Sequence, residues 1–141
     1  MRILFVDTSF YVALLNRRDR LRRRAQALYA ELTARSDVVF VTTEAVLVEL
    51  LTRMAGFGAE ARDLAADSVT RLSSDPRVTI VPFTRESFAA DLALYRRRLD
   101  KTYSMTDCMS MAPCREQRIT EVLTSDHDFE QERFTILLGE A

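Results

Sequence analysis

The sequence predicts an α/β sandwich, built on a mainly parallel sheet of four to five strands with helices on its faces. Short apolar runs of strand length alternate with longer segments in which apolar residues recur every three or four positions. The chain has 141 residues, which is room for one domain. Hydrophobic residues make up 48% and charged residues 29%, values typical of a globular protein and not of a disordered chain. We therefore expect a single domain over 1–141.

Each strand is predicted from a short apolar run. Ile3-Leu4-Phe5-Val6, stopped by Asp7, has the pattern of a strand buried on both faces. Similar runs predict further strands at 38–41, 78–81, 120–123 and 134–138. Helical periodicity or capping residues predict helices at 10–15, 21–34, 44–55, 59–72, 85–99 and about 104–117. Because helices separate the strands, parallel pairing is favoured.

Pro113 conflicts with the last of these helices. It falls about seven residues into the helix, where it lacks the N–H donor and crowds the preceding turn. We expect a kink or break costing ~3 kcal/mol, which would displace Asp107 or shorten the helix. In addition, Gln117-Arg118 stands where a glycine would ordinarily end a helix.

Several features favour a cytoplasmic protein with no membrane association. Cys108 and Cys114 lie six apart on a predicted helix, so roughly 9 Å of rise prevents them from forming a disulfide with each other. Reduced thiols indicate a reducing compartment. No run approaches ~18 apolar residues, and the N-terminus lacks the pattern of a signal peptide.

Four carboxylates are predicted to gather at one edge of the sheet. Asp7 follows the first strand, and Asp126 lies just past the fourth. Glu49 lies on the helix that Thr42-Thr43 begin, and Asp107 opens a later helix. In a parallel sheet, ligands gather at the carboxyl ends of the strands. No cysteine or histidine spacing suggests zinc, and an all-oxygen cluster suits Mg²⁺ or Mn²⁺.

Each carboxylate also has an ordinary structural explanation. Asp7 is in position to cap the helix that follows it. Glu49 is four residues from Arg53, a common surface pair. Asp107 meets a favourable helix dipole, and Asp126 sits in a turn-like string beside His127. Taken singly, none of these signals is specific.

Their order along the chain is more informative. Asp7-Thr8-Ser9 after a strand, Val46-Leu47-Val48-Glu49, Ser104-Met105-Thr106-Asp107-Cys108, and Leu123-Thr124-Ser125-Asp126-His127-Asp128-Phe129 follow one another in register. Together they resemble the PIN-domain family, and within it the VapC-type ribonuclease toxins of bacterial toxin–antitoxin pairs. The resemblance covers almost the whole chain, from Ile3 to Leu138.

The resemblance implies a PIN-like three-layer sandwich that hydrolyses RNA phosphodiesters with Mg²⁺ or Mn²⁺. Asp7, Glu49, Asp107 and Asp126 would be the catalytic and metal-binding residues. Thr8, Ser9 and Ser125 would be supporting hydroxyls. The resemblance also implies a homodimer and a cognate antitoxin protein as partner.

Basic residues are concentrated although the formal net charge is only -1. Six arginines lie between Arg17 and Arg24, and three are consecutive at 96–98. These runs favour contact with RNA phosphates, and the candidates are Arg20, Arg23, Arg97 and Lys101. A solvated surface is the alternative.

Two other functions remain open at this stage. One is a housekeeping RNA-processing nuclease with the same chemistry. The other is a non-catalytic α/β module whose carboxylates only hold a metal or contact a protein, and Pro113 is its best support.

Overall fold

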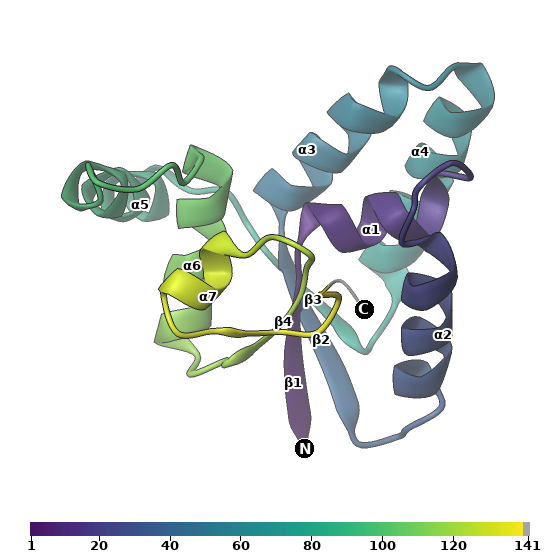
Figure 1. The fold of residues 1–141 in the computed structure, drawn as a ribbon, viewed down its shortest axis with the longest axis horizontal. Helices are drawn as coiled ribbons and strands as arrows, with labels where there is room; N and C mark the ends of the chain where they lie inside the picture. The colour runs from purple at the N-terminus through teal and green to yellow at the C-terminus, as the bar shows by residue number, and fades with distance from the viewer. Residues whose placement is uncertain (140–141) are drawn as a thin grey trace.

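In the computed structural model, which describes residues 1–139, five parallel strands form one sheet in the order β3-β2-β1-β4-β5 (Figure 1). The strands are β1 (Arg2–Val6), β2 (Val38–Thr43), β3 (Val78–Val81), β4 (Glu121–Leu123) and β5 (Thr135–Ile136). The predicted α/β class and parallel sheet are confirmed. The predicted domain extends to 140–141, which lie outside the described residues.

All six predicted helices are present, and one short helix was not predicted. The helices are α1 (Thr8–Leu15), α2 (Arg22–Thr33), α3 (Glu44–Ala55), α4 (Ala59–Ser74), α5 (Arg85–Arg97), α6 (Met105–Glu116) and α7 (Asp128–Gln131). The unpredicted helix is α7, whose four residues are too few to show a helical period.

Helices cover both faces of the sheet, which explains why the central strand is apolar from Ile3 to Val6. Figure 1 shows α1–α4 on one side of the strands and α5–α7 on the other. β1 pairs with β2 and β4, and Leu4, Phe5 and Val6 are buried. A strand covered on both faces has no position for a polar side chain. The first polar residue after β1 therefore comes at its carboxyl end, as Asp7.

Pro113 does not break α6, so that expectation was wrong. The helix continues from Met105 to Glu116 with Pro113 inside it, so α6 accommodates the missing N–H donor without a break. The helix then closes by two bonds, from Ile119 N–H to the Cys114 carbonyl (2.7 Å) and from Arg118 N–H to the Arg115 carbonyl (3.2 Å). Arg118 takes the left-handed position (φ 58°) that a glycine ordinarily fills.

Two further features relate to the expected compartment. Cys108 and Cys114 are free thiols buried in the core. Among residues 1–139, no helix is both long and apolar enough to cross a lipid bilayer.

Candidate active site

Asp7 lies at the carboxyl end of β1, beside the end of β4. Val6 pairs with Leu123, so the residues that follow the two strands are neighbours. The Thr124 hydroxyl donates to Asp7 Oδ2 at 2.8 Å, and Asp7 is only 5% exposed. Asp7 occupies the N-cap position of α1, yet its side chain makes no capping hydrogen bond. Helix capping therefore does not account for this carboxylate.

Burial raises the pKa of Asp7 to about 7. Hydrogen bonds from Thr124 and from the Thr8 backbone oppose this rise in the pKa, and the charges of Asp107 and Glu49 add to it. A buried carboxylate that also faces other carboxylates has a destabilised ionised form. Asp7 thus releases its proton near neutral pH.

A hydrogen-bond network that includes two hydroxyl groups leads to Asp7. Ser125 N–H donates to Ser9 Oγ at 3.1 Å, and Ser9 Oγ lies 3.0 Å from Thr124 Oγ1. When Asp7 is ionised, the single hydroxyl hydrogen of Thr124 points to Asp7, so Ser9 donates to Thr124. Asp126 N–H also donates to Thr124 Oγ1, at 3.0 Å. Every donor in this hydrogen-bond network is directed toward the Asp7 carboxylate.

Thr124 is the polar residue that the sequence analysis missed. It follows β4 directly, as Asp7 follows β1, and that equivalence was the signal that could have identified it. Ser9 contributes its hydroxyl to this arrangement, whereas Ser125 contributes its backbone N–H, and the supporting roles predicted for their hydroxyls stay predictions.

Three aspartates converge beside Asp7. One carboxylate oxygen each from Asp107, Asp126 and Asp128 lie within 4.8 Å of one another. Asp107 is held in the first turn of α6 by a capping box with Ser104, in which both hydrogen bonds measure 3.0 Å. Asp126 Oδ1 accepts from Asp128 N–H at 2.9 Å, which fixes the β4–α7 turn. Asp128 was quoted in the sequence motif but was not among the predicted site residues.

The three aspartates form no ion pair in the part of the chain that the structure describes. None of the ion pairs among residues 1–139 includes Asp107, Asp126 or Asp128. Burial raises the pKa of Asp107 to about 6, and the charges of Asp126 and Asp128 contribute to the same rise. The pKa of Asp128 is raised by burial and then by Asp126, and Lys101 opposes this rise.

The donor set fits a hard divalent cation. Aspartate oxygens from α6 and from the β4–α7 turn are the ligand type that Mg²⁺ and Mn²⁺ prefer. The buried hydroxyl of Thr8, next to Asp7, has no hydrogen-bond partner among the described residues. A bound cation or phosphate would offset the repulsion of the carboxylates and give this hydroxyl a partner.

Glu49 and His127 lie outside the cluster formed by the three aspartates. Glu49 is half-buried on α3 and makes no ion pair with Arg53, and its charge acts on Asp7. It is not among the carboxylates that converge within 4.8 Å. His127 is exposed and contacts Glu130 through Nδ1. Glu49 is thus a neighbour of Asp7, whereas His127 pairs outside the aspartate cluster.

The basic candidates divide into two regions. Arg20 and Arg23 are exposed beyond α1, whose eight residues carry the chain roughly 12 Å away from Asp7. Arg97 is exposed at the end of α5. Lys101 alone of the four acts on the pKa of an aspartate in the cluster. RNA contact by these residues stays a prediction.

Together, the fold and the site define an α/β protein with an acidic centre, able to hold a divalent cation, at the carboxyl edge of a parallel sheet. Residues 4–134 match the family model of the PIN domain, and the chain belongs to the PIN-domain family. The resemblance found in the sequence motifs is confirmed.

Similarity to known proteins extends over most of the chain. It is 33% identical over 130 residues to the 23S rRNA-specific endonuclease VapC20 of Mycobacterium tuberculosis, covering 90% of this chain and 92% of that protein. The crystal structure of M. tuberculosis VapC20, titled a sarcin-ricin loop cleaving toxin, superposes with a TM-score of 0.80 at 29% identity over 94% of this chain and 96% of that one. FitAcB from Neisseria gonorrhoeae shares the fold, with a TM-score of 0.65 at 20% identity over 95% and 96% of the two chains.

Proposed function

We propose that this chain is an endoribonuclease that depends on Mg²⁺ or Mn²⁺ and acts as the toxin of a toxin–antitoxin pair. The observation that carries the proposal is the convergence of Asp107, Asp126 and Asp128 within 4.8 Å, beside buried Asp7 and without an ion pair among residues 1–139. A structural cluster would carry its own counter-charge. These carboxylates instead depend on a cation supplied from solution.

The proposal gives each group a separate task. Asp107, Asp126 and Asp128 supply the oxygens that hold a divalent cation, with Asp7 and Glu49 beside them. A bound cation of this kind lowers the pKa of a coordinated water and offsets charge on the attacked phosphate. Thr124 and Ser9 fix the orientation of the Asp7 carboxylate through directed hydrogen bonds. The Thr8 hydroxyl, without a partner in the described residues, is available to donate to a phosphate oxygen.

The substrate class follows from the relatives. VapC20 of M. tuberculosis is named for cleavage of 23S rRNA, and at 33% identity over 90% of this chain it supports RNA as the substrate here. Several solved neighbours are toxin–antitoxin complexes, VapBC2 of Rickettsia felis and FitAB among them, which supports an antitoxin as protein partner. A cytoplasmic location and a homodimer belong to the same proposal.

Cleavage of RNA by the purified chain tests the activity. A mixed RNA pool and intact ribosomes are each incubated with Mn²⁺, with Mg²⁺ or with EDTA, and Asp7→Asn is purified in parallel. We expect cleavage with either metal, none in EDTA, and none from the variant. Cleavage that persists in EDTA or in Asp7→Asn would contradict the proposed site.

Two companion measurements separate the alternatives. Growth arrest on expression, relieved by the product of a neighbouring gene, supports the toxin over a housekeeping nuclease. A rise in melting temperature with Mn²⁺, without cleavage of any RNA, would support the non-catalytic metal-binding module instead.

A further inference from the structure

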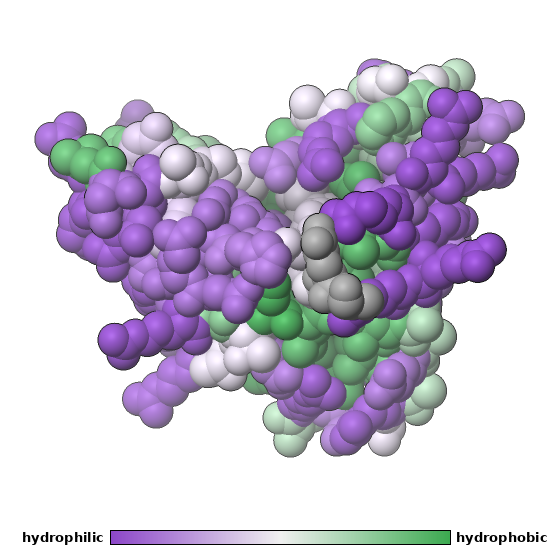
Figure 2. Space-filling model, viewed as in Figure 1, coloured by the Kyte–Doolittle hydropathy of each residue, from purple (hydrophilic) through white to green (hydrophobic). Residues whose placement is uncertain are grey.

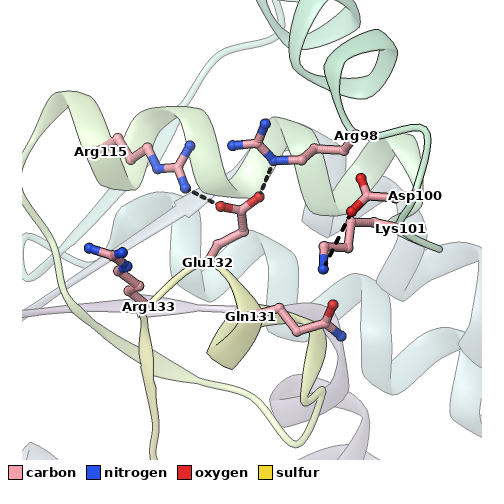
Figure 3. A pocket seen from close by; sticks show the side chains of 7 residues that line it. All are labelled: Arg98, Asp100, Lys101, Arg115, Gln131, Glu132 and Arg133. Atoms are coloured by element: carbon pink, nitrogen blue, oxygen red, sulfur yellow. Dashed lines mark hydrogen bonds and ion pairs between the residues drawn. The ribbon is translucent and has the colours of Figure 1, made fainter.

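A basic hollow lies next to the aspartate cluster, on the side where α5 ends and α6 and α7 meet. It encloses about 580 Å³ (Figure 3). Its lining residues are Arg98, Asp100, Lys101, Arg115, Gln131, Glu132 and Arg133. Four of these are cationic and two are anionic, so the lining carries a net charge of about +2 in a chain whose formal charge is -1.

One of the two acidic groups in the hollow, Glu132, is already paired with two arginines of the same hollow. Glu132 is largely buried and accepts from Arg98 Nε and Arg115 Nη2, each at 2.5 Å, and Figure 3 shows the two guanidinium groups reaching it from either side. A guanidinium carries five N–H donors. Glu132 therefore fixes both arginines and leaves most of their donors for another ligand.

The other two cations are weakly engaged. Lys101 Nζ is 3.7 Å from Asp100, whose side chain is 74% exposed, and a surface pair of this kind contributes little. Arg133 is exposed, and within residues 1–139 none of the ion pairs includes it. Positive charge in the hollow is thus in excess of what the surrounding residues balance.

The hollow and the aspartate cluster share α7 as a common wall. Gln131 lines the hollow and donates through Nε2 to Asp128 Oδ1 at 3.1 Å. Lys101 lies close enough to Asp128 to oppose the rise in the pKa of that carboxyl. α7 is a single turn, about 5 Å along its axis, with Asp128 at its first residue and Glu132 and Arg133 of the hollow just after its last.

We propose that this hollow binds a backbone phosphate of the RNA strand, one that flanks the bond positioned at the aspartates. The inference rests on the proposed nuclease function. A polyanion brought to a cluster of carboxylates is repelled, and cations one helical turn away offset that repulsion. RNA fits better than an acidic protein segment, because the hollow adjoins the proposed catalytic site through the Gln131–Asp128 hydrogen bond.

The salt dependence of RNA binding tests this assignment. Binding of a fluorescent single-stranded RNA is measured in EDTA, which prevents metal-dependent cleavage, over a range of salt concentrations. For single strands the slope of log K against log [salt] is about -0.7 per phosphate contact. We expect Lys101→Gln/Arg133→Gln to weaken binding at least fivefold at low salt and to reduce the slope by about 1.4, which is two contacts.

Two control variants isolate the effect of charge in the hollow. Lys101→Arg/Arg133→Lys keeps both charges and should retain affinity and slope, unless the first variant acts by distorting the fold. Arg62→Gln/Arg85→Gln removes two exposed charges that do not line the hollow and should leave the slope unchanged.

The outcomes distinguish this inference from the nuclease proposal. An unchanged slope in Lys101→Gln/Arg133→Gln, in a chain that does cleave RNA, would overturn the phosphate site. If that variant keeps RNA binding but loses affinity for the antitoxin, the hollow is a protein contact and the assignment is also wrong. Charge-dependent RNA binding that is lost in the variant, in a chain with no metal-dependent cleavage, would overturn the nuclease and leave the hollow supported.

Discussion

Charged side chains at the carboxyl edge and at the amino edge of the sheet have opposite environments. At the carboxyl edge, Asp7 and the three aspartates beside it crowd together with hydroxyl and amide donors but without a cation from the described residues. At the amino edge, Arg77 precedes β3 and is surrounded by acceptors. Its guanidinium donates to the carbonyls of Thr33 (2.8 Å), Arg35 (2.5 Å) and Val38 (2.9 Å).

The difference separates a structural charge from a functional one. Arg77 supplies cationic donors to the carbonyls at the end of α2, where the helix dipole is negative, and its guanidinium lies 5.9 Å from the Phe40 ring centre. All of these contacts favour the folded state. At the aspartates, burial and neighbouring charges raise pKa values, so the folded state tolerates these groups at a cost. A cost of this kind indicates a site that is completed by a ligand.

The largest effect is expected from removing one charge at the carboxyl edge. Asp107→Asn keeps the size of the side chain and an oxygen that accepts from Ser104 N–H, but removes a metal-binding charge. We expect the rate of RNA cleavage to fall at least about 1,000-fold, measured with the substrate found for the unmodified chain. Asp63→Asn, on the exposed surface of α4, is the matched control and should retain full activity. Comparable rates in the two variants would remove Asp107 from the site.

The pH dependence of stability should carry the opposite sign from that of an ordinary ion-paired aspartate. The pKa of Asp7 is about 7 in the folded chain and 3.8 in the ordinary reference state. Between these values the folded chain holds a proton that the unfolded chain has released. The free energy of unfolding, measured by urea titration in EDTA, should therefore fall by up to about 4 kcal/mol from pH 4 to pH 8.

Asp7→Asn sharpens this measurement because it removes the titrating group. The variant should lose the part of the pH dependence that Asp7 contributes, keep the part due to Asp107, whose pKa is also raised, and be more stable than the unmodified chain at pH 8 in EDTA. Mn²⁺ should stabilise the unmodified chain most at high pH, since binding requires ionised carboxylates. A metal-free chain that becomes more stable from pH 4 to pH 8 would show that Asp7 is not strained in the folded state.

The amino edge should respond to mutation in stability and not in catalysis. Arg77→Met leaves the half-buried carbonyls of Thr33 and Val38 without these donors, and we expect the free energy of unfolding to fall by about 1–3 kcal/mol. Arg77→Lys should recover only part of this loss, because an ammonium cannot match the planar geometry of the guanidinium. Arg62→Met, exposed on α4, should change stability by no more than about 0.5 kcal/mol. An Arg77→Met variant as stable as this control would show that Arg77 does not hold the edge together.

The sequence allowed prediction of the sheet and of the edge where the carboxylates gather, because both depend on local patterns. Apolar runs located the strands, and the first polar residue after β1 located Asp7. The participation of Thr124 and Asp128 depends instead on the register of β1 with β4 and on the turn before α7. Neither the strand register nor the turn produces a periodic pattern in the sequence. Arg77 was missed for the same reason, since its partners come from α2 and β2.

Pro113 shows where a local rule failed. A proline inside a helix removes one backbone hydrogen bond and crowds the preceding turn, yet α6 continues past Pro113 to Glu116 and closes at Arg118. Sequence placed the residue correctly but could not give the exact end of the helix, which is set by the closing bonds of Arg118 and Ile119.

The smallest predicted effect concerns this helix end, which lies at the amino edge just before β4. Arg118 adopts a φ of 58°, a left-handed conformation that costs a side chain with a Cβ but not a glycine. Arg118→Gly should raise the free energy of unfolding by about 0.5–1 kcal/mol, because it removes this conformational strain. Part of the gain is offset because glycine has more conformational entropy to lose when the chain folds. RNA cleavage should not change, since Arg118 is remote in the sheet from the aspartates. A loss of activity with intact stability would show that the two edges are coupled through α6, which has Asp107 in its first turn and Arg118 just beyond its last.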